Sequence, residues 1–232
     1  RMVVRGDNGN GEIMSVKALY CERLHYLDTE LGILINYLKS SGLWDESLII
    51  LTGDHGLGGV LWKKHGDFAL YDERIRVPFV VKRPEGSSQG PERIETPTNA
   101  SISALSIICS TLDIPFPSDQ ENLPQWSREL EGIAISETIM HPEHHDYALA
   151  LTSNEYKYFF RCKINWEKVQ MEEFLYDKLF RISNGKTDEV NDISHHRPKE
   201  VRRFKELAVN VVQSNLAFLR SHLPVNLTDL AY

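Results

Sequence analysis

The sequence lacks the marks of several protein classes. It contains 3 cysteines, Cys21, Cys109 and Cys162, and none of them forms a Cys-x-x-Cys pair. They are too few and too widely spaced for the disulfide framework of a small secreted domain. No apolar run approaches the roughly 18–20 residues that a membrane-spanning helix needs, so we expect no membrane span. The net charge of −7 argues against nucleic acid as a partner, because phosphate binding requires a basic surface.

An initiator methionine is also absent, since the chain begins with Arg1. The first residues do not show the basic and then apolar pattern of a secretory signal. We therefore expect that the chain is part of a longer protein, and the sequence leaves the cellular compartment open. What the chain does have is an ordinary globular composition, with 41% hydrophobic and 25% charged residues.

The first half of the chain shows the pattern of an α/β protein. Apolar residues recur at helical spacing from Val16 to Leu38. Short continuous apolar runs at 48–52 and 77–81 are typical of strands that are covered on both faces. We therefore predict part of a large mixed, mainly parallel sheet flanked by helices, within a domain over residues 1–125.

The second half of the chain changes to short β-rich segments. After a helix predicted at 102–112, aromatic-rich segments begin at Tyr147 and are separated by polar turn residues, which predicts a small antiparallel sheet. The last predicted element is a helix from Pro198 to Ser221 with one mostly apolar face. We expect these segments to form a small α+β subdomain over residues 126–232.

Two potential metal ligands, Asp54 and His55, directly follow the first predicted strand. In open α/β sheets ligands bind at the carboxyl ends of strands, and Gly53 and Gly56 allow the turn that would bring both side chains to one ion. An Asp oxygen with a His nitrogen suits Mn²⁺ or Zn²⁺, whereas an oxygen-rich remainder of the shell would suit Ca²⁺ or Mg²⁺. The alternative interpretation is an ordinary turn after a strand, since Gly and Asp are common turn formers.

Several motifs in a definite order resemble a known family. The motifs are Tyr20 and Asp28 in the first helix, Asp54-His55-Gly56, Lys63-Lys64-His65-Gly66, Tyr71-Asp72-Glu73, Arg76-Val77-Pro78, Ile133–Glu137, Tyr156–Tyr158 and Phe174–Asp177. In this order the chain resembles the sulfatase family of the alkaline-phosphatase superfamily. The similarity covers nearly the whole chain.

The resemblance implies roles for three residues. Asp54 and His55 match a pair that binds a divalent cation, and Lys64 matches a catalytic lysine that contacts the ester oxygens. Lys63 competes for that last role, and a solvated basic loop is the alternative for both lysines. By resemblance Ca²⁺ is the favoured cofactor, with Mn²⁺, Mg²⁺ and Zn²⁺ as alternatives. The implied substrate is a sulfate ester, which a covalent nucleophile would attack.

The nucleophile that the family uses is not found in this sequence. Sulfatases make a formylglycine in a Cys/Ser-x-Pro/Ala-x-Arg motif, and no cysteine or serine here has those neighbours. The family's first acidic metal ligands would also precede Arg1. We therefore expect the C-terminal half of a sulfuric ester hydrolase, inactive by itself, whose sheet edge is covered by the missing half or by an oligomer partner. A phosphate or phosphonate ester hydrolase of the same superfamily, or a non-catalytic sulfatase-like binding protein, is the alternative.

Overall fold

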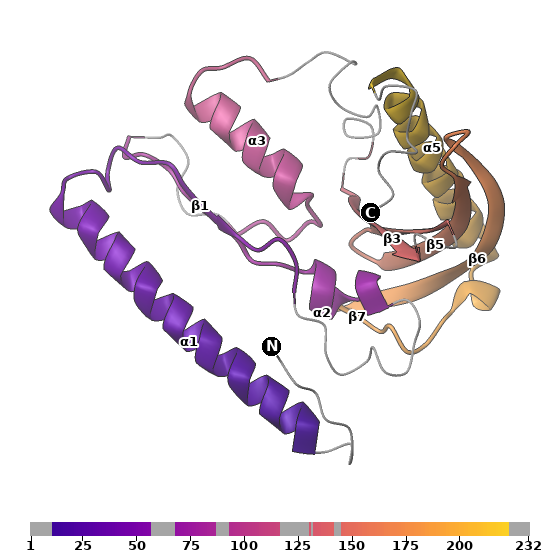
Figure 1. Cartoon of the computed structure of the whole chain (residues 1–232), viewed down its shortest axis with the longest axis horizontal. Coiled ribbons are helices and arrows are strands. Elements are labelled where there is room, and N and C mark those ends of the chain that lie inside the picture. Colours follow the sequence, from indigo (N-terminus) through magenta and orange to yellow (C-terminus); the bar gives the residue numbers. More distant parts are fainter. Residues whose placement is uncertain are drawn as a thin grey trace.

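The structure is a computed structural model that describes residues 11–56, 68–86, 93–116, 130, 132–141 and 145–222. Its elements form two regions that lie beside each other, one before residue 117 and one after residue 129 (Figure 1). Within the described ranges, no helix is both long and apolar enough to cross a bilayer.

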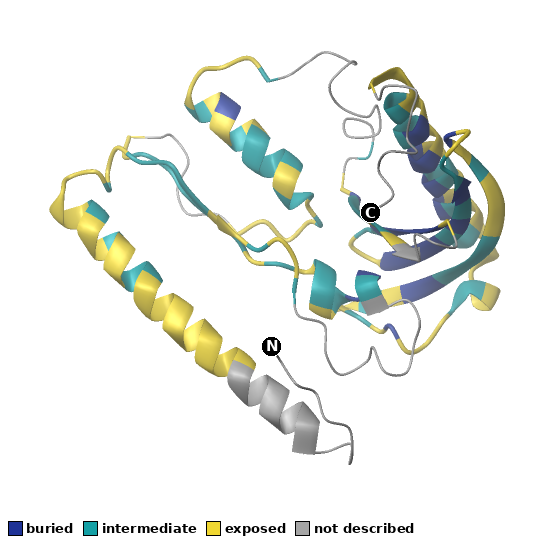
Figure 2. Cartoon of the chain, in the orientation of Figure 1, coloured by how far each residue is buried: buried dark blue, intermediate teal, exposed yellow. Residues whose placement is uncertain are grey.

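The first region begins with a long helix, α1, over Gly11–Ser40. The helical spacing of apolar residues predicted this element, and the structure confirms it. From residue 20 onward no residue of α1 is buried, and Leu24, Leu27 and Leu34 are 47%, 59% and 52% exposed. Figure 2 shows exposed residues along most of the helix. Its apolar face therefore lies largely in solvent.

Two short strands follow, β1 over Ile49–Thr52 and β2 over Phe79–Lys82. They pair with each other in an antiparallel register, with Ile49 opposite Lys82. The prediction of a mainly parallel sheet is therefore wrong for this structure. A continuous apolar run indicates burial and carries no information about strand direction, which the path of the connecting segment decides. Leu51 and Val80 are also 38% and 56% exposed, so the described residues do not cover these strands fully.

The helix α3 completes the first region and covers Ala100–Thr111, close to its predicted bounds. The side chain of Asn99 does not cap this helix. Its Oδ1 instead accepts a 2.7 Å hydrogen bond from the backbone N–H of Ile135. This bond ties the start of α3 to the second region.

The second region contains a curled sheet of antiparallel strands in the order β3-β4-β5-β6-β7 (Figure 1). The strands are β3 over Ala134–His141, β4 over Asp146–Thr152, β5 over Tyr156–Asn165, β6 over Gln170–Ser183 and β7 over Lys186–Thr187. Each strand pairs with the next in sequence, as in a β-meander. The predicted small antiparallel sheet is confirmed.

The larger hydrophobic core lies between this sheet and the helix α5, over Pro198–His222. A 3-10 turn, η3, over Ser194–His196 leads into the helix. The ring of Phe204 on α5 stacks on Tyr158 of β5, with centroids 5.7 Å apart. The predicted C-terminal helix is therefore present, and its apolar face packs on the sheet.

The opposite face of the sheet carries residues from the first region. Alternate residues of β5 point to opposite faces, so Phe159 points away from α5. Phe159 forms a second buried cluster with Leu70 and Tyr71. Leu70 ends the 3-10 helix η1, Phe68–Leu70, and Tyr71 directly precedes the short helix α2, Asp72–Ile75. The ring of Tyr71 stacks on Phe159 at 5.7 Å. The two regions therefore share buried contacts.

The predicted domain boundary between residues 125 and 126 falls in the segment 117–129, which lies outside the described residues. The division into domains 1–125 and 126–232 therefore stays a prediction. Because α2 and η1 precede this boundary and yet pack on the sheet that follows it, the described parts of the two predicted domains contact each other.

Candidate functional site

The turn after β1 carries the two predicted metal ligands. The backbone N–H of His55 donates a 2.8 Å hydrogen bond to Oδ1 of Asp54, and His55 Nε2 lies 3.7 Å from Asp54 Oδ2. The side chains of Asp54 and His55 are 89% and 57% exposed. The structure thus brings the two side chains together at an accessible point.

The ring of His55 is oriented by the turn itself. Its Nδ1 lies 2.8 Å from the carbonyl oxygen of Gly56. Because a carbonyl only accepts hydrogen bonds, this contact requires the proton on Nδ1 and leaves the lone pair on Nε2. Metal-binding histidines commonly donate their second ring N–H to a carbonyl in this way. The nitrogen nearer to Asp54 is therefore the one that can bind a metal.

The spacing of these two side chains fits a single divalent cation. Metal–ligand bonds of about 2.0–2.6 Å allow two ligands of one ion to lie up to about 4–5 Å apart, and Asp54 Oδ2 and His55 Nε2 are 3.7 Å apart. The hydrogen bond from the backbone N–H of His55 lowers the pKa of Asp54, and a protonated His55 ring would lower it further. No group of three or more His, Cys, Asp or Glu residues that could hold a metal occurs among the described residues. Asp54 and His55 therefore fit a cation but supply only part of its shell.

Gly56 holds this turn against α2. Its backbone N–H donates a 2.6 Å hydrogen bond to the carbonyl oxygen of Arg74. A Cβ atom at position 56 would lie 2.1 Å from the carbonyl oxygen of Glu73, far inside van der Waals contact. Glycine is thus required here by the close approach of two backbone segments.

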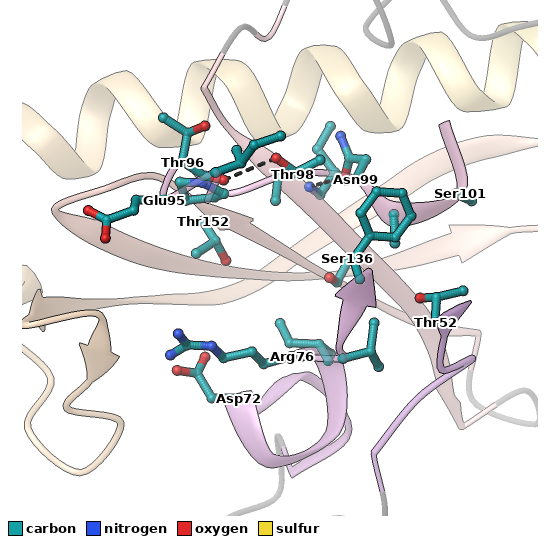
Figure 3. A pocket seen from close by; sticks show the side chains of 18 of the residues that line it. Thr52, Asp72, Arg76, Glu95, Thr96, Thr98, Asn99, Ser101, Ser136 and Thr152 are labelled. Carbon is teal, nitrogen blue, oxygen red and sulfur yellow. Dashed lines mark hydrogen bonds between the residues drawn. The ribbon is translucent and has the colours of Figure 1, made fainter. Parts of the chain in front are cut away.

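A cleft of about 1250 Å³ opens beside Asp54. Asp72 and Arg76, at the two ends of α2, also line it, as does Ser136 of β3. Figure 3 labels Asp72 and Arg76 among the residues that line this cleft. His55 is not among its lining residues, so the pair of predicted ligands lies at the edge of the cleft.

Lys64, the predicted catalytic lysine, lies outside the described residues, as does its competitor Lys63. Both belong to the segment 57–67, between Gly56 and the start of η1. The role of Lys64 therefore stays a prediction.

Sequence reasoning missed one buried charged residue near this site. Lys157 has no exposed surface, and its Nζ bonds to carboxylate oxygens of Asp72 and Glu189. The available signal was a lysine between two strand tyrosines, Tyr156 and Tyr158. A charged side chain inside a strand that is buried on both faces requires charged partners.

The family model of sulfatases matches residues 4–129. The chain belongs to the sulfatase family. The resemblance carried by the sequence motifs is thereby confirmed. The match includes the Asp54–His55 turn, α2 and the segment that contains Lys64.

Named relatives of this sulfatase-family chain are longer proteins. The multifunctional alkaline phosphatase superfamily protein PehA of Trinickia caryophylli is 35% identical over 104 residues, which cover 44% of this chain and 20% of PehA. The ulvan-active sulfatase of Formosa agariphila is 26% identical over 116 residues, which cover 49% of this chain and 23% of the relative. The chain therefore aligns with about a fifth of the length of each relative.

Solved structures show the same fold. A sulfatase-designated protein from Bacteroides thetaiotaomicron superposes with a TM-score of 0.59 at 17% identity, over 86% of this chain and 43% of that one. The sulfatase-designated protein yidJ of Bacteroides fragilis gives a TM-score of 0.54 at 19% identity, over 85% and 42%. At these identities the comparison supports the fold alone.

Proposed function

We propose that this chain is part of a hydrolase that acts on sulfate esters with the help of a divalent cation. The proposal is carried by the pair Asp54 Oδ2 and His55 Nε2, which lie 3.7 Å apart at the end of β1 in a sulfatase-family chain. Asp54 and His55 hold the cation, and Lys64 contacts the ester oxygens. Ca²⁺ is the expected cation by family resemblance, with Mn²⁺, Mg²⁺ and Zn²⁺ as alternatives.

Each of the three residues has a defined chemical task. A bound divalent cation would act as a Lewis acid on an ester oxygen. Asp54 contributes a carboxylate whose lowered pKa keeps it ionised. His55 contributes Nε2, because its Nδ1 is engaged by the Gly56 carbonyl. The ammonium of Lys64 would offset negative charge that develops on the ester oxygens in the transition state.

The proposal requires a nucleophile and further acidic ligands from outside this chain. We expect them in another region of a longer protein, in keeping with the 20–43% of their lengths over which the relatives align. The exposed apolar side chains of α1 and the outer edges of β1 and β2 offer that region a surface to cover. An oligomer partner that covers the same surface is the alternative.

A second candidate is the hydrolysis of phosphate or phosphonate esters with a Ser or Thr nucleophile. The similarity to PehA, a multifunctional alkaline phosphatase superfamily protein by name, is consistent with this candidate. The residues beside the nucleophile in the upstream coding sequence would distinguish the two reactions.

The decisive experiment expresses this chain together with its upstream coding sequence and measures hydrolysis of 4-nitrophenyl sulfate, 4-nitrophenyl phosphate and an aryl phosphonate. We expect the sulfate to react fastest, with activity lost on chelation and restored by Ca²⁺ or Mn²⁺. Asp54→Ala should reduce kcat/KM by about 100-fold or more, since it removes a cation ligand. Glu46→Gln, at an exposed position before β1, is the matched control and should leave kcat/KM unchanged.

Other results would replace the proposal. Faster hydrolysis of the phosphate or phosphonate would favour the second candidate. A folded protein that binds no divalent cation, and whose melting temperature in added metal is the same with and without Asp54→Ala, would indicate a non-catalytic binding protein. Substantial arylsulfatase activity from the 232-residue chain by itself would contradict the half-site that we propose.

A further inference from the structure

A buried charged network joins the two regions on the face of the sheet opposite α5. Lys157 of β5 has no exposed side-chain surface, and its Nζ lies 2.7 Å from Oδ1 of Asp72, the first residue of α2. Lys157 Nζ also bonds to Oε1 of Glu189, whose side chain is 4% exposed. The same Glu189 oxygen accepts a 2.8 Å hydrogen bond from the backbone N–H of Asp72. Asp72, at the start of α2, is thus held through both its side chain and its backbone N–H.

The charges in this network depend on the position of α2. Burial raises the pKa of Glu189 despite the nearby Lys157 ammonium. Burial opposes ionisation of Asp72 as well, but Lys157 and a hydrogen bond from Thr187 outweigh it, and the pKa of Asp72 is lowered. Movement of α2 away from the sheet would take one carboxylate from a buried ammonium, which is strongly unfavourable. The network therefore resists displacement of α2.

A second set of contacts continues from α2 to the metal-ligand turn. The Arg74 carbonyl accepts the hydrogen bond from the Gly56 N–H at 2.6 Å, and the Gly56 carbonyl lies 2.8 Å from Nδ1 of His55. Only glycine fits at position 56 because the backbone of Glu73 lies against it. Arg76 adds another tether, since its guanidinium donates to the carbonyl of Gly185 beside β7. A continuous path of contacts thus leads from Lys157 to the His55 ring.

We propose that Lys157, Asp72 and Glu189 form a positioning network that sets the orientation of the Asp54–His55 turn. The C-terminal sheet holds α2 through this network, and α2 holds the turn through Gly56. None of the three is a cation ligand in this inference, because they act through α2. Their effect on the turn follows from the fold alone, whereas their effect on a bound cation rests on the proposed function.

Amide hydrogen exchange of Gly56 in the full 232-residue chain tests the network directly. Asp72→Ala removes the carboxylate on α2 and leaves Lys157 paired with Glu189. We expect the Gly56 amide to exchange on the order of 10-fold faster, while the amide of Phe160 in the sheet core changes by less than about 2-fold. Asp72→Asn, which keeps an oxygen toward Lys157, should recover part of the protection.

Lys157→Met is the second variant, with Lys163→Met as its matched control. Lys163 lies on the same strand and face but is 40% exposed and pairs with Glu173 at 2.8 Å. We expect Lys157→Met to accelerate Gly56 exchange and Lys163→Met to leave it unchanged. If Lys157→Met does not fold, the exchange rate of the Gly56 amide in Asp72→Ala tests the positioning network by itself.

A titration with Mn²⁺, followed by line broadening of the His55 ring and Gly56 amide signals, measures the effect on the cation. We expect about 10-fold weaker binding in Asp72→Ala than in the wild type. Unchanged Gly56 exchange in Asp72→Ala, or equal acceleration of Gly56 and Phe160, would overturn the positioning network. Absence of Mn²⁺ broadening in the wild type would instead refute the proposed cation site. The exchange data would still show whether Lys157, Asp72 and Glu189 orient the turn.

Discussion

At the level of single residues, Gly56 determines the geometry of the turn that carries Asp54 and His55. Its N–H is bonded to Arg74 and its carbonyl to His55 Nδ1, so one residue both fixes the turn and selects the tautomer of its neighbour. The nitrogen that remains is the one 3.7 Å from Asp54. In the proposed site, Asp54 and His55 would supply the cation ligands, and the close approach of α2 explains the glycine at position 56.

Gly56→Ala should displace the turn. The added Cβ would lie 2.1 Å from the Glu73 carbonyl oxygen, so either the turn or α2 must move. We expect a loss of about 1–3 kcal/mol in the free energy of unfolding, measured by urea denaturation, and about 10-fold weaker Mn²⁺ binding.

The control for this substitution is Gly32→Ala on α1. Apart from the chain neighbours and the backbone of its own helix, no heavy atom lies within 4 Å of the Cβ that alanine would add there. The helical position should gain about 0.5–1 kcal/mol in stability. Equal effects of the two substitutions would contradict the close approach at Gly56.

Asp72→Asn should produce a pH-dependent loss of stability. Burial raises the pKa of Asp72, but Lys157 and Thr187 outweigh it, so the folded-state pKa lies below the reference value of 3.8. The ionised carboxylate thus stabilises the fold above that value, and this contribution is lost as the pH falls through the lower folded-state pKa. We expect a loss of about 1.5–3 kcal/mol near pH 7, the usual contribution of hydrogen bonds to charged groups.

The measurement is the free energy of unfolding of both proteins from about pH 7 downward. The difference between wild type and variant should shrink as the pH falls below 3.8. A difference that stays constant or grows on acidification would show that Asp72 is not the ionised partner of Lys157.

Among the elements, β5 is the strand that contacts residues on both faces of the C-terminal sheet. Its even-numbered residues from Tyr156 to Ile164 face α5. Phe159 and Lys157 face α2 instead. One strand therefore packs against the C-terminal helix on one side and against Tyr71 and α2 on the other. The sequence pattern of β5 predicted a strand. It did not predict that the second face of this strand is covered, because the covering residues lie far away in sequence.

Phe204→Ala should destabilise the contact between α5 and the sheet. Phe204 is 2% exposed and stacks on Tyr158 at 5.7 Å. Removing a buried phenyl ring typically costs about 3–5 kcal/mol, which urea denaturation would measure. Gln213→Ala, at an exposed position of the same helix, should change stability by less than about 0.5 kcal/mol. A similarly small effect at Phe204 would contradict the packing described here.

At the scale of the whole molecule, the described core is distributed unevenly. Nearly all buried apolar residues belong to the sheet, α5 and the η1–α2 segment that packs on the sheet. The described part of α1 from residue 20, together with β1 and β2, contributes no buried residue. The apolar side chains of α1, β1 and β2 are therefore the surface that the further region in our proposal would cover.

Hydrogen exchange over the whole chain should follow this distribution. Local opening requires less free energy where few apolar contacts are broken. We expect amides of β4, β5 and α5 to be at least about 100-fold more protected than those of α1, β1 and β2. Exchange measured by mass spectrometry on peptides would test this, and uniform protection would indicate that α1 already has its packing partner, for example in a homodimer.

The sequence by itself determined the three long helices, most strands, the antiparallel C-terminal sheet and the family, because hydrophobic periodicity and ordered motifs are local properties of the chain. It did not predict α2, β3 or β7 as elements. It also indicated Asp54 and His55, since both follow a strand directly. Only the tertiary structure decided the antiparallel pairing of β1 with β2, the contact of Gly56 with α2, and the burial of Lys157 between Asp72 and Glu189. These features join residues far apart in sequence, and the pattern around each residue does not specify its distant partner.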